Sequence, residues 1–187
     1  MTMIKLSRYS RRALRFGRNE DGISAVEFAL VAPFMALLYF GCIELSLMMQ
    51  TDRRVTSAAS TMGDLVARAA IMTDDDVTEV FEASRMIFQP SPVENARLRI
   101  SSLVEDEGTV VVGWSEANEN WTARSEGESI EVPDNLVPAG GSVIFAEVEF
   151  DYSSTIGYFI QNTRTLTDEF YLRPRRVNLV EREDQDD

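Results

Sequence analysis

The 187-residue chain has 31 acidic and 18 basic residues, no histidine and one cysteine, and its net charge at pH 7 is −13. The lack of histidine excludes Ser-His-Asp triads and histidine-bearing metal sites, and the only lysine is Lys5, so we predict no enzyme, no cofactor and no bound metal. The sole cysteine, Cys42, cannot form an internal disulfide, and the acidic balance opposes binding to nucleic acid phosphates.

Charge is distributed unevenly along the chain. Residues 1–22 carry six basic and two acidic side chains, whereas the remainder carries 12 arginines and 29 acids. Basic residues that flank the first apolar segment of a membrane protein stay in the cytoplasm. We therefore expect residues 1–22 to be a basic cytoplasmic leader and the acidic remainder to be exported, as in a single-pass membrane protein.

The next segment, residues 21–28, reads DGISAVEF and places one acid, Glu27, at the start of an apolar run. A charge at that position is costly unless another group pairs with it. Cleavage after Gly22 would create an amino group on Ile23, one helical turn from Glu27 or facing Glu27 of a neighbouring subunit. The alternative is a carboxylate that lies at the cytoplasmic interface and reaches the lipid headgroups.

The apolar run predicts a transmembrane helix over residues 23–49. Sixteen uncharged residues separate Glu27 from Glu44, which corresponds to about 24 Å of helix. Glu44 is expected to end the membrane span, and contact with another membrane helix is the alternative. Pro33 interrupts the backbone hydrogen bonding of this helix and predicts a kink or a loosened turn.

The spacing of Gly22 and Glu27 resembles the processing site of type IV prepilins. More narrowly, the stretch from Gly22 to Pro33 resembles the TadE-like family, pilin-like proteins of the tight-adherence (Flp) pilus and Tad secretion apparatus. Residues 173–175, with the sequence RPR, add to this resemblance, whereas Phe28 stands where Flp-type pilins often have tyrosine. The resemblance implies a prepilin peptidase, other Tad/Flp components, the major pilin and other pseudopilins as partners, besides membrane lipid.

After residue 50 the apolar positions recur with helical spacing, so the membrane helix is expected to continue as a stalk to about Met72. Thr73 is then expected to cap a second, amphipathic helix whose first turn holds three aspartates. Pro90 and Pro92 are expected to end this helix. A calcium site at the aspartates is an alternative, although they lack the regular spacing of calcium ligands.

Extended structure is predicted from residue 96 onward. A hairpin is expected around the turn at residues 106–108, and Val143–Tyr152 shows the clearest strand alternation. A last strand is predicted near Thr165–Arg173, and residues 177–187 are expected to form an acidic flexible tail. The fold class predicted for residues 50–176 is therefore α+β, a pilin-like periplasmic domain with a helical stalk, a second helix and a small antiparallel sheet.

These features predict a TadE-like minor pilin or pseudopilin of the bacterial inner membrane, possessing a cytoplasmic N-terminus and a periplasmic C-terminal domain. In the role implied by the resemblance, Gly22 and Ile23 form the processing site, and Glu27, Phe28 and Pro33 act in assembly of a Flp-type pilus for adhesion. The alternative is an uncleaved, membrane-anchored periplasmic protein that binds a ligand or partner. The two hypotheses differ in the fate of residues 1–22 and in whether Glu27 is needed for self-association.

Overall fold

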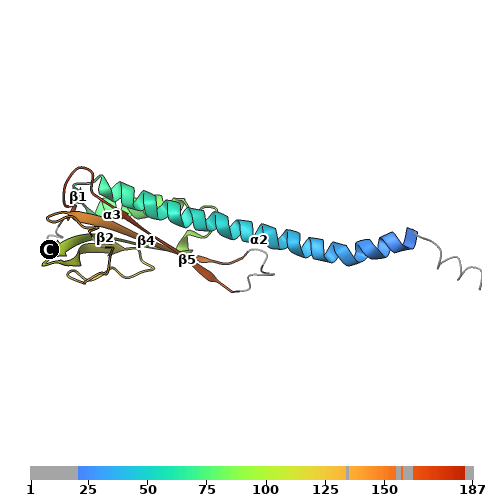
Figure 1. Ribbon diagram of the computed structural model, residues 1–187. Helices are drawn as coiled ribbons and strands as arrows, with labels where there is room; N and C mark the ends of the chain where they lie inside the picture. Colours follow the sequence, from blue (N-terminus) through green and yellow to red (C-terminus); the bar gives the residue numbers. More distant parts are fainter. Residues whose placement is uncertain (1–20, 134, 155–156, 158–161, 184–187) are drawn as a thin grey trace, which may run out of the picture. The chain divides into compact units, whose positions relative to one another are not determined.

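The computed structural model describes residues 21–133, 135–154, 157 and 162–183 (Figure 1). Residues 1–20 of the predicted leader therefore lie outside the described residues. The chain divides into two compact units, Met1–Leu45 and Ser46–Asp187, which we call the N-terminal and C-terminal units. The two units are described separately below.

Helix α2 (Asp21–Ala67) supplies all the described structure of the N-terminal unit. Most residues of this part of α2 are apolar, and a backbone without water around it must satisfy its polar groups within a helix. The helix continues through Pro33, although proline lacks the amide that would donate to the carbonyl of Ala29. Figure 1 shows a gentle bend within the blue part of the helix. This is the long N-terminal apolar helix that the sequence predicted.

The last part of α2 forms one wall of the C-terminal unit's core. Its buried residues recur every three or four positions, so they share one helical face; they are Val55, Ala58, Ala59, Met62 and Val66. Gly63 lies on the same contact, where an added Cβ would come within 2.5 Å of the Leu172 Cδ1 atom. The absence of a side chain at Gly63 thus lets the helix approach the sheet closely.

A four-stranded antiparallel sheet packs against this face of α2. It contains β2 (Ala96–Asp106), β3 (Thr109–Ala117), β4 (Ser142–Tyr152) and β5 (Arg164–Leu172), in the spatial order β3-β2-β4-β5. Its inner face joins the core through alternate residues, among them Leu98, Ile100, Ile144, Ala146 and Val148. The predicted hairpin is confirmed as β2 and β3, with positive φ angles at Glu107 and Gly108 in the turn.

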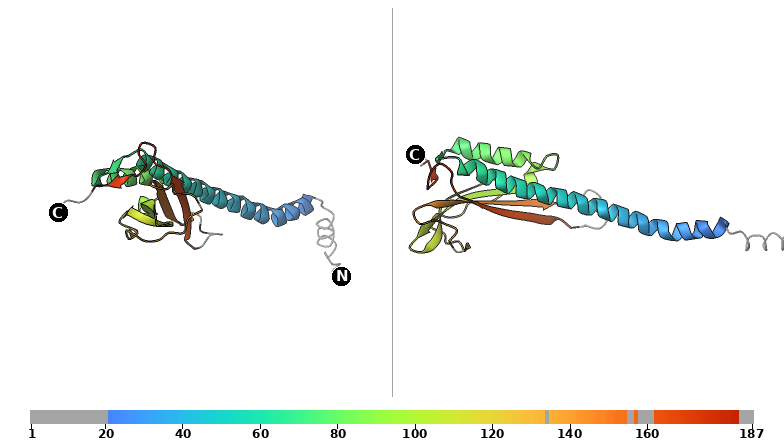
Figure 2. Two further views of the ribbon diagram at one scale, coloured as in Figure 1. Left: turned by 60° about the vertical axis from the view of Figure 1, so that its left-hand side comes forward. Right: turned by 45° about the horizontal axis from the view of Figure 1, so that its top comes forward.

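Helix α3 (Asp74–Met86) lies beside α2 in Figures 1 and 2 and buries Val77, Val80 and Phe81. Thr73 caps it as predicted: its hydroxyl accepts from the Asp76 amide at 3.1 Å, while the Asp76 carboxylate accepts from the Thr73 amide at 3.0 Å. The Thr73 hydroxyl also donates to the Asp76 carboxylate at 2.7 Å, and this bond, together with the one from the Thr73 amide, lowers the pKa of Asp76. A short 3₁₀ turn, η1 (Val93–Asn95), then leads into β2. The second helix and the small sheet confirm the predicted α+β class.

The structure differs from the sequence prediction between residues 67 and 72. Helix α2 ends at Ala67, whereas the predicted stalk extends to about Met72. Residues Ile71–Met72 instead form β1, which pairs in parallel with β6 (Glu181–Arg182). The amide of Arg175 also donates to the carbonyl of Ala67 at 2.8 Å. The C-terminal segment thus takes up the backbone groups that a longer helix would have used.

The C-terminal segment also differs from the flexible tail predicted from residue 177. Val180 is fully buried, and its carbonyl accepts from the Trp114 indole at 2.8 Å. Arg182 forms ion pairs with Glu116 and Asp74 and donates to the carbonyl of Met72 at 2.9 Å. Residues 177–183 are therefore an ordered part of the C-terminal unit, and residues 184–187 lie outside the described residues.

Candidate functional site

The predicted processing and assembly residues lie in the first part of α2. Gly22 and Ile23 are helical and lie among the first described residues of α2. Ile23 is 60% exposed, Glu27 is exposed and Phe28 is 73% exposed. Ile23 and Glu27 are four positions apart and therefore occupy one face of the helix. An amine on Ile23 would lie within one turn of this carboxylate.

Apolar side chains are exposed around the whole circumference of this helix. In the N-terminal unit the large exposed ones are Ile23, Val26, Phe28, Leu30, Val31, Phe34, Met35, Leu37, Leu38, Tyr39, Phe40 and Leu45. Helix α2 is long and apolar enough to cross a membrane, and none of its most apolar window is buried in the protein. A helix that is apolar on all sides requires lipid or other apolar helices around it.

The other two predicted residues of this helix have contrasting surroundings. Pro33 is exposed, so this residue is not buried against the described part of the chain. Glu44 is 1% exposed, unlike Glu27. The structure thus separates the two acids of the apolar segment by their burial, a difference that the sequence did not indicate.

A second group of charged residues lies on the outer face of the sheet. Glu147 accepts hydrogen bonds from Arg99 at 2.7 and 2.8 Å and from Arg124 at 2.8 and 3.2 Å. Burial favours the neutral form of Glu147, but these two guanidinium groups outweigh it and hold its pKa below the ordinary value of 4.5. Trp121 stacks on Arg99, with 4.1 Å between the guanidinium carbon and the ring centre. This cluster ties the loop after β3 to the sheet.

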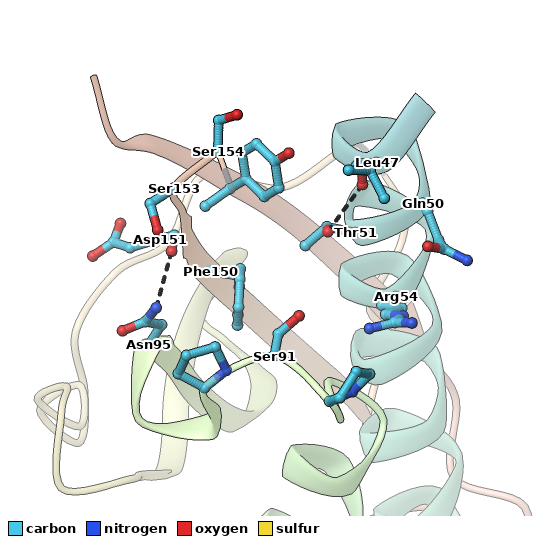
Figure 3. Close-up of a pocket in the computed structure, with 13 residues that line it drawn as sticks. Leu47, Gln50, Thr51, Arg54, Ser91, Asn95, Phe150, Asp151, Ser153 and Ser154 are labelled. Atoms are coloured by element: carbon cyan, nitrogen blue, oxygen red, sulfur yellow. Dashed lines mark hydrogen bonds between the residues drawn. The ribbon is translucent and has the colours of Figure 1, made fainter. Parts of the chain in front are cut away.

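A cavity of about 440 Å³ lies elsewhere in the C-terminal unit (Figure 3). Leu47, Gln50, Thr51 and Arg54 of α2 form one side of it, as Figure 3 shows. The other lining residues come from the loop before β2 and from the end of β4; they are Pro90, Ser91, Pro92, Asn95, Phe150, Asp151, Tyr152, Ser153 and Ser154. The cavity is thus lined by hydroxyl and amide groups, one arginine, one aspartate and two aromatic rings.

The sequence located the apolar segment but neither the Glu147 cluster nor the cavity. Alternating arginines on β2 and alternating acids on β4 are a usable signal for cross-strand pairs, since Arg99 is registered opposite Glu147. The cavity has no comparable signal, because three distant segments form it. The described residues contain no group of three or more histidines, cysteines or acids arranged to hold a metal.

Comparison with known proteins gives one match. A family model described as "TadE-like protein" matches residues 22–62, which include Gly22, Glu27, Pro33 and Glu44. No curated protein and no solved structure matches the chain. The match ends within α2, before α3 and the sheet begin. It confirms the resemblance to the TadE-like family and supports a Tad/Flp pilus-associated protein.

Proposed function

We propose that this protein is a minor pilin or pseudopilin that acts in assembly of a Flp-type pilus for adhesion. The observation that carries the proposal is a helix apolar on every side whose uncharged run begins directly after the exposed acid Glu27. Lipid can surround such a helix before assembly, and neighbouring pilin helices can replace the lipid afterwards. The TadE-like match over the same residues supports this interpretation.

The proposed first step is cleavage between Gly22 and Ile23 by a prepilin peptidase. Both residues are helical in α2, so the bond must leave the helix before it can enter a protease as extended chain. Glycine lowers the cost of this opening, because it is about 1 kcal/mol less favourable than alanine inside a helix.

The proposed second step is pairing of the new Ile23 amine with Glu27 of a neighbouring helix. In an apolar surrounding, two opposite charges attract strongly, and each is costly when left alone. Phe28 would pack beside this pair, and Pro33 would ease bending of the helix as it passes from lipid into a bundle. The inner membrane would hold the protein before assembly, with the part from residue 50 onward in the periplasm.

Replacement of Glu27 tests the assembly step. We expect Glu27→Gln to reduce co-purification with the other Tad/Flp components from detergent-solubilised membranes by about tenfold or more, since loss of a buried charge pair exceeds about 1.4 kcal/mol. Asp52→Asn is the matched control, because Asp52 is an exposed acid of the same helix. Equal recovery of Glu27→Gln and wild type would contradict the proposed pairing.

A further inference from the structure

Arg54 differs from the other partly buried arginines. The described residues contain six such arginines, and five form ion pairs with carboxylates; the five are Arg85, Arg97, Arg99, Arg124 and Arg182. Within the described part of the chain, Arg54 forms no ion pair with a carboxylate. A partly buried cation is costly without a compensating anion. Arg54 therefore has the property expected of a group that binds an anionic ligand.

The position of Arg54 allows a ligand to reach it. Its guanidinium lines the cavity of about 440 Å³, and its Nη1 donates to the carbonyl of Phe88 at 3.1 Å. The amide of Ser91 donates to the same carbonyl at 2.8 Å, so Arg54 and Ser91 lie next to each other in the cavity. A guanidinium has five N–H donors in a fork that suits the oxygens of a phosphate. The bond to Phe88 positions this fork.

Asp151 is the one acid among the lining residues, and its carboxylate already has partners. It accepts hydrogen bonds from Arg97 at 2.7 and 3.1 Å and from the Thr165 hydroxyl at 2.7 Å. These hydrogen bonds lower the pKa of Asp151 and keep it ionised. In Figure 3 Asp151 lies on the side of the cavity away from Arg54. It therefore opposes an anion beside Arg54 only weakly.

The place of the cavity along α2 indicates the source of the anion. Leu47 lies three residues after Glu44, where the uncharged run ends. From residue 49, where the predicted transmembrane helix ends, to Arg54 the helix rises about 7–8 Å, and the headgroup region on each side of a bilayer is about 5–7 Å thick, so Arg54 lies at its outer edge. Side chains on a helix point back toward its N-terminus, which for Arg54 is toward the proposed membrane span. Leu47 and Phe150 add apolar surface to the same cavity.

We propose that the cavity around Arg54 binds the phosphate group of an anionic phospholipid headgroup. Arg54 holds the phosphate oxygens, Ser91 and Ser153 contact the polar headgroup, and Leu47 contacts the first part of an acyl chain. The choice of a lipid as the source rests on the proposed membrane span of α2. Neither cleavage after Gly22 nor any pilus component is needed for this binding.

Titration calorimetry on the full uncleaved chain in nonionic detergent tests the proposal. The probes are dihexanoylphosphatidylglycerol and, separately, inorganic phosphate. We expect saturable binding of the lipid, and Arg54→Gln should weaken it about tenfold, the usual effect of losing a hydrogen bond to a charged group. Arg53→Gln is the matched control, because it removes the same charge from an exposed neighbouring position and should change the affinity less than about twofold.

A second variant separates ligand binding from folding. Ser91→Asp places a carboxylate beside Arg54, where it should compete with the ligand and weaken lipid binding about tenfold while providing the arginine with a partner. Absence of lipid binding by the wild type, or equal weakening by Arg53→Gln, would overturn the proposal. Phosphate binding as tight as lipid binding would overturn the lipid as the source. All three tests use the leader-bearing chain without a peptidase, so they are independent of the proposed pilin role.

Discussion

Replacement of Glu147 by glutamine is expected to destabilise the C-terminal unit strongly. Glu147 retains 11% of its side-chain exposure and receives two hydrogen bonds from Arg99 and two from Arg124. Glutamine has nearly the same shape but offers one acceptor oxygen instead of two. Its amide group would face arginine N–H donors, so the variant keeps at most half of this hydrogen bonding. It also leaves Arg99 without a counter-ion and Arg124 with Glu128 alone.

The expected loss is about 3–5 kcal/mol, the usual effect of removing one partner from a buried ion pair. The two lost hydrogen bonds to a charged group give a similar figure, at about 1.5–3 kcal/mol each. Arg99 and Arg124 are 13% and 21% exposed, so solvent screens these charges little. Such a loss is a large share of the 5–15 kcal/mol that typically separates folded from unfolded domains.

Urea unfolding of the full chain in nonionic detergent, followed by tryptophan fluorescence, measures this effect. Glu169→Gln is the matched control: Glu169 is registered directly opposite Glu147 on β5, but it is exposed and forms no ion pair within the described residues. We expect this control to unfold within about 0.5 kcal/mol of the wild type. A free energy of unfolding for Glu147→Gln within about 1 kcal/mol of the wild type would refute the reasoning.

Further predictions concern the helices, the C-terminal segment and pH. Thr73→Ala should cost about 1 kcal/mol in urea unfolding, because it removes the cap of α3; no loss would contradict the role of that cap. Gly63→Val should cost about 1–3 kcal/mol through its clash with Leu172, whereas a thermal transition at or above that of the wild type would contradict the tight packing. Val180→Ala should lower the free energy of unfolding by about 2 kcal/mol, whereas Leu179→Ala, at an exposed position, should lower it by less than about 0.5 kcal/mol. Equal effects of the two variants would argue against an ordered C-terminal segment. Because folding lowers the pKa of Glu147, the contribution of this residue to the free energy of unfolding is present above pH 4.5 and is lost as the pH falls through the lowered value. The difference in unfolding free energy between wild type and Glu147→Gln should therefore narrow in acid. A difference that stays constant with pH would contradict this.

The parts of the fold that the sequence predicted are those with local signals. Strand β4 alternates apolar and acidic residues, and Thr73 is followed by an acidic first turn and an amphipathic helix. The hairpin of β2 and β3 is indicated by Gly108 between two apolar runs. Each signal comes from residues close together in the chain, where periodicity and turn chemistry determine the structure.

The parts that the sequence did not predict depend on distant partners. Arg182 pairs with Glu116 and Asp74, which lie 66 and 108 residues away in the chain. Val180 is buried, but it lies beside a charged stretch of sequence, which gave no indication of that burial. The cavity at Arg54 likewise joins α2 to the loop before β2 and to the end of β4. The residues of the N-terminal candidate site could be named from the sequence, since Gly22 and Glu27 lie five residues apart. The burial of Glu44 was not, because helical periodicity does not reveal what surrounds a residue.

The mature N-terminus tests the central proposal most directly. The full chain should be expressed with and without its cognate prepilin peptidase, and its terminus read by intact mass and terminal peptide sequencing, with Gly22→Ala as the control. We predict a terminus at Ile23 only when the peptidase is present, and little cleavage of Gly22→Ala. Retention of residues 1–22 by the wild type in the presence of active peptidase would contradict processing and favour the uncleaved, membrane-anchored binding protein.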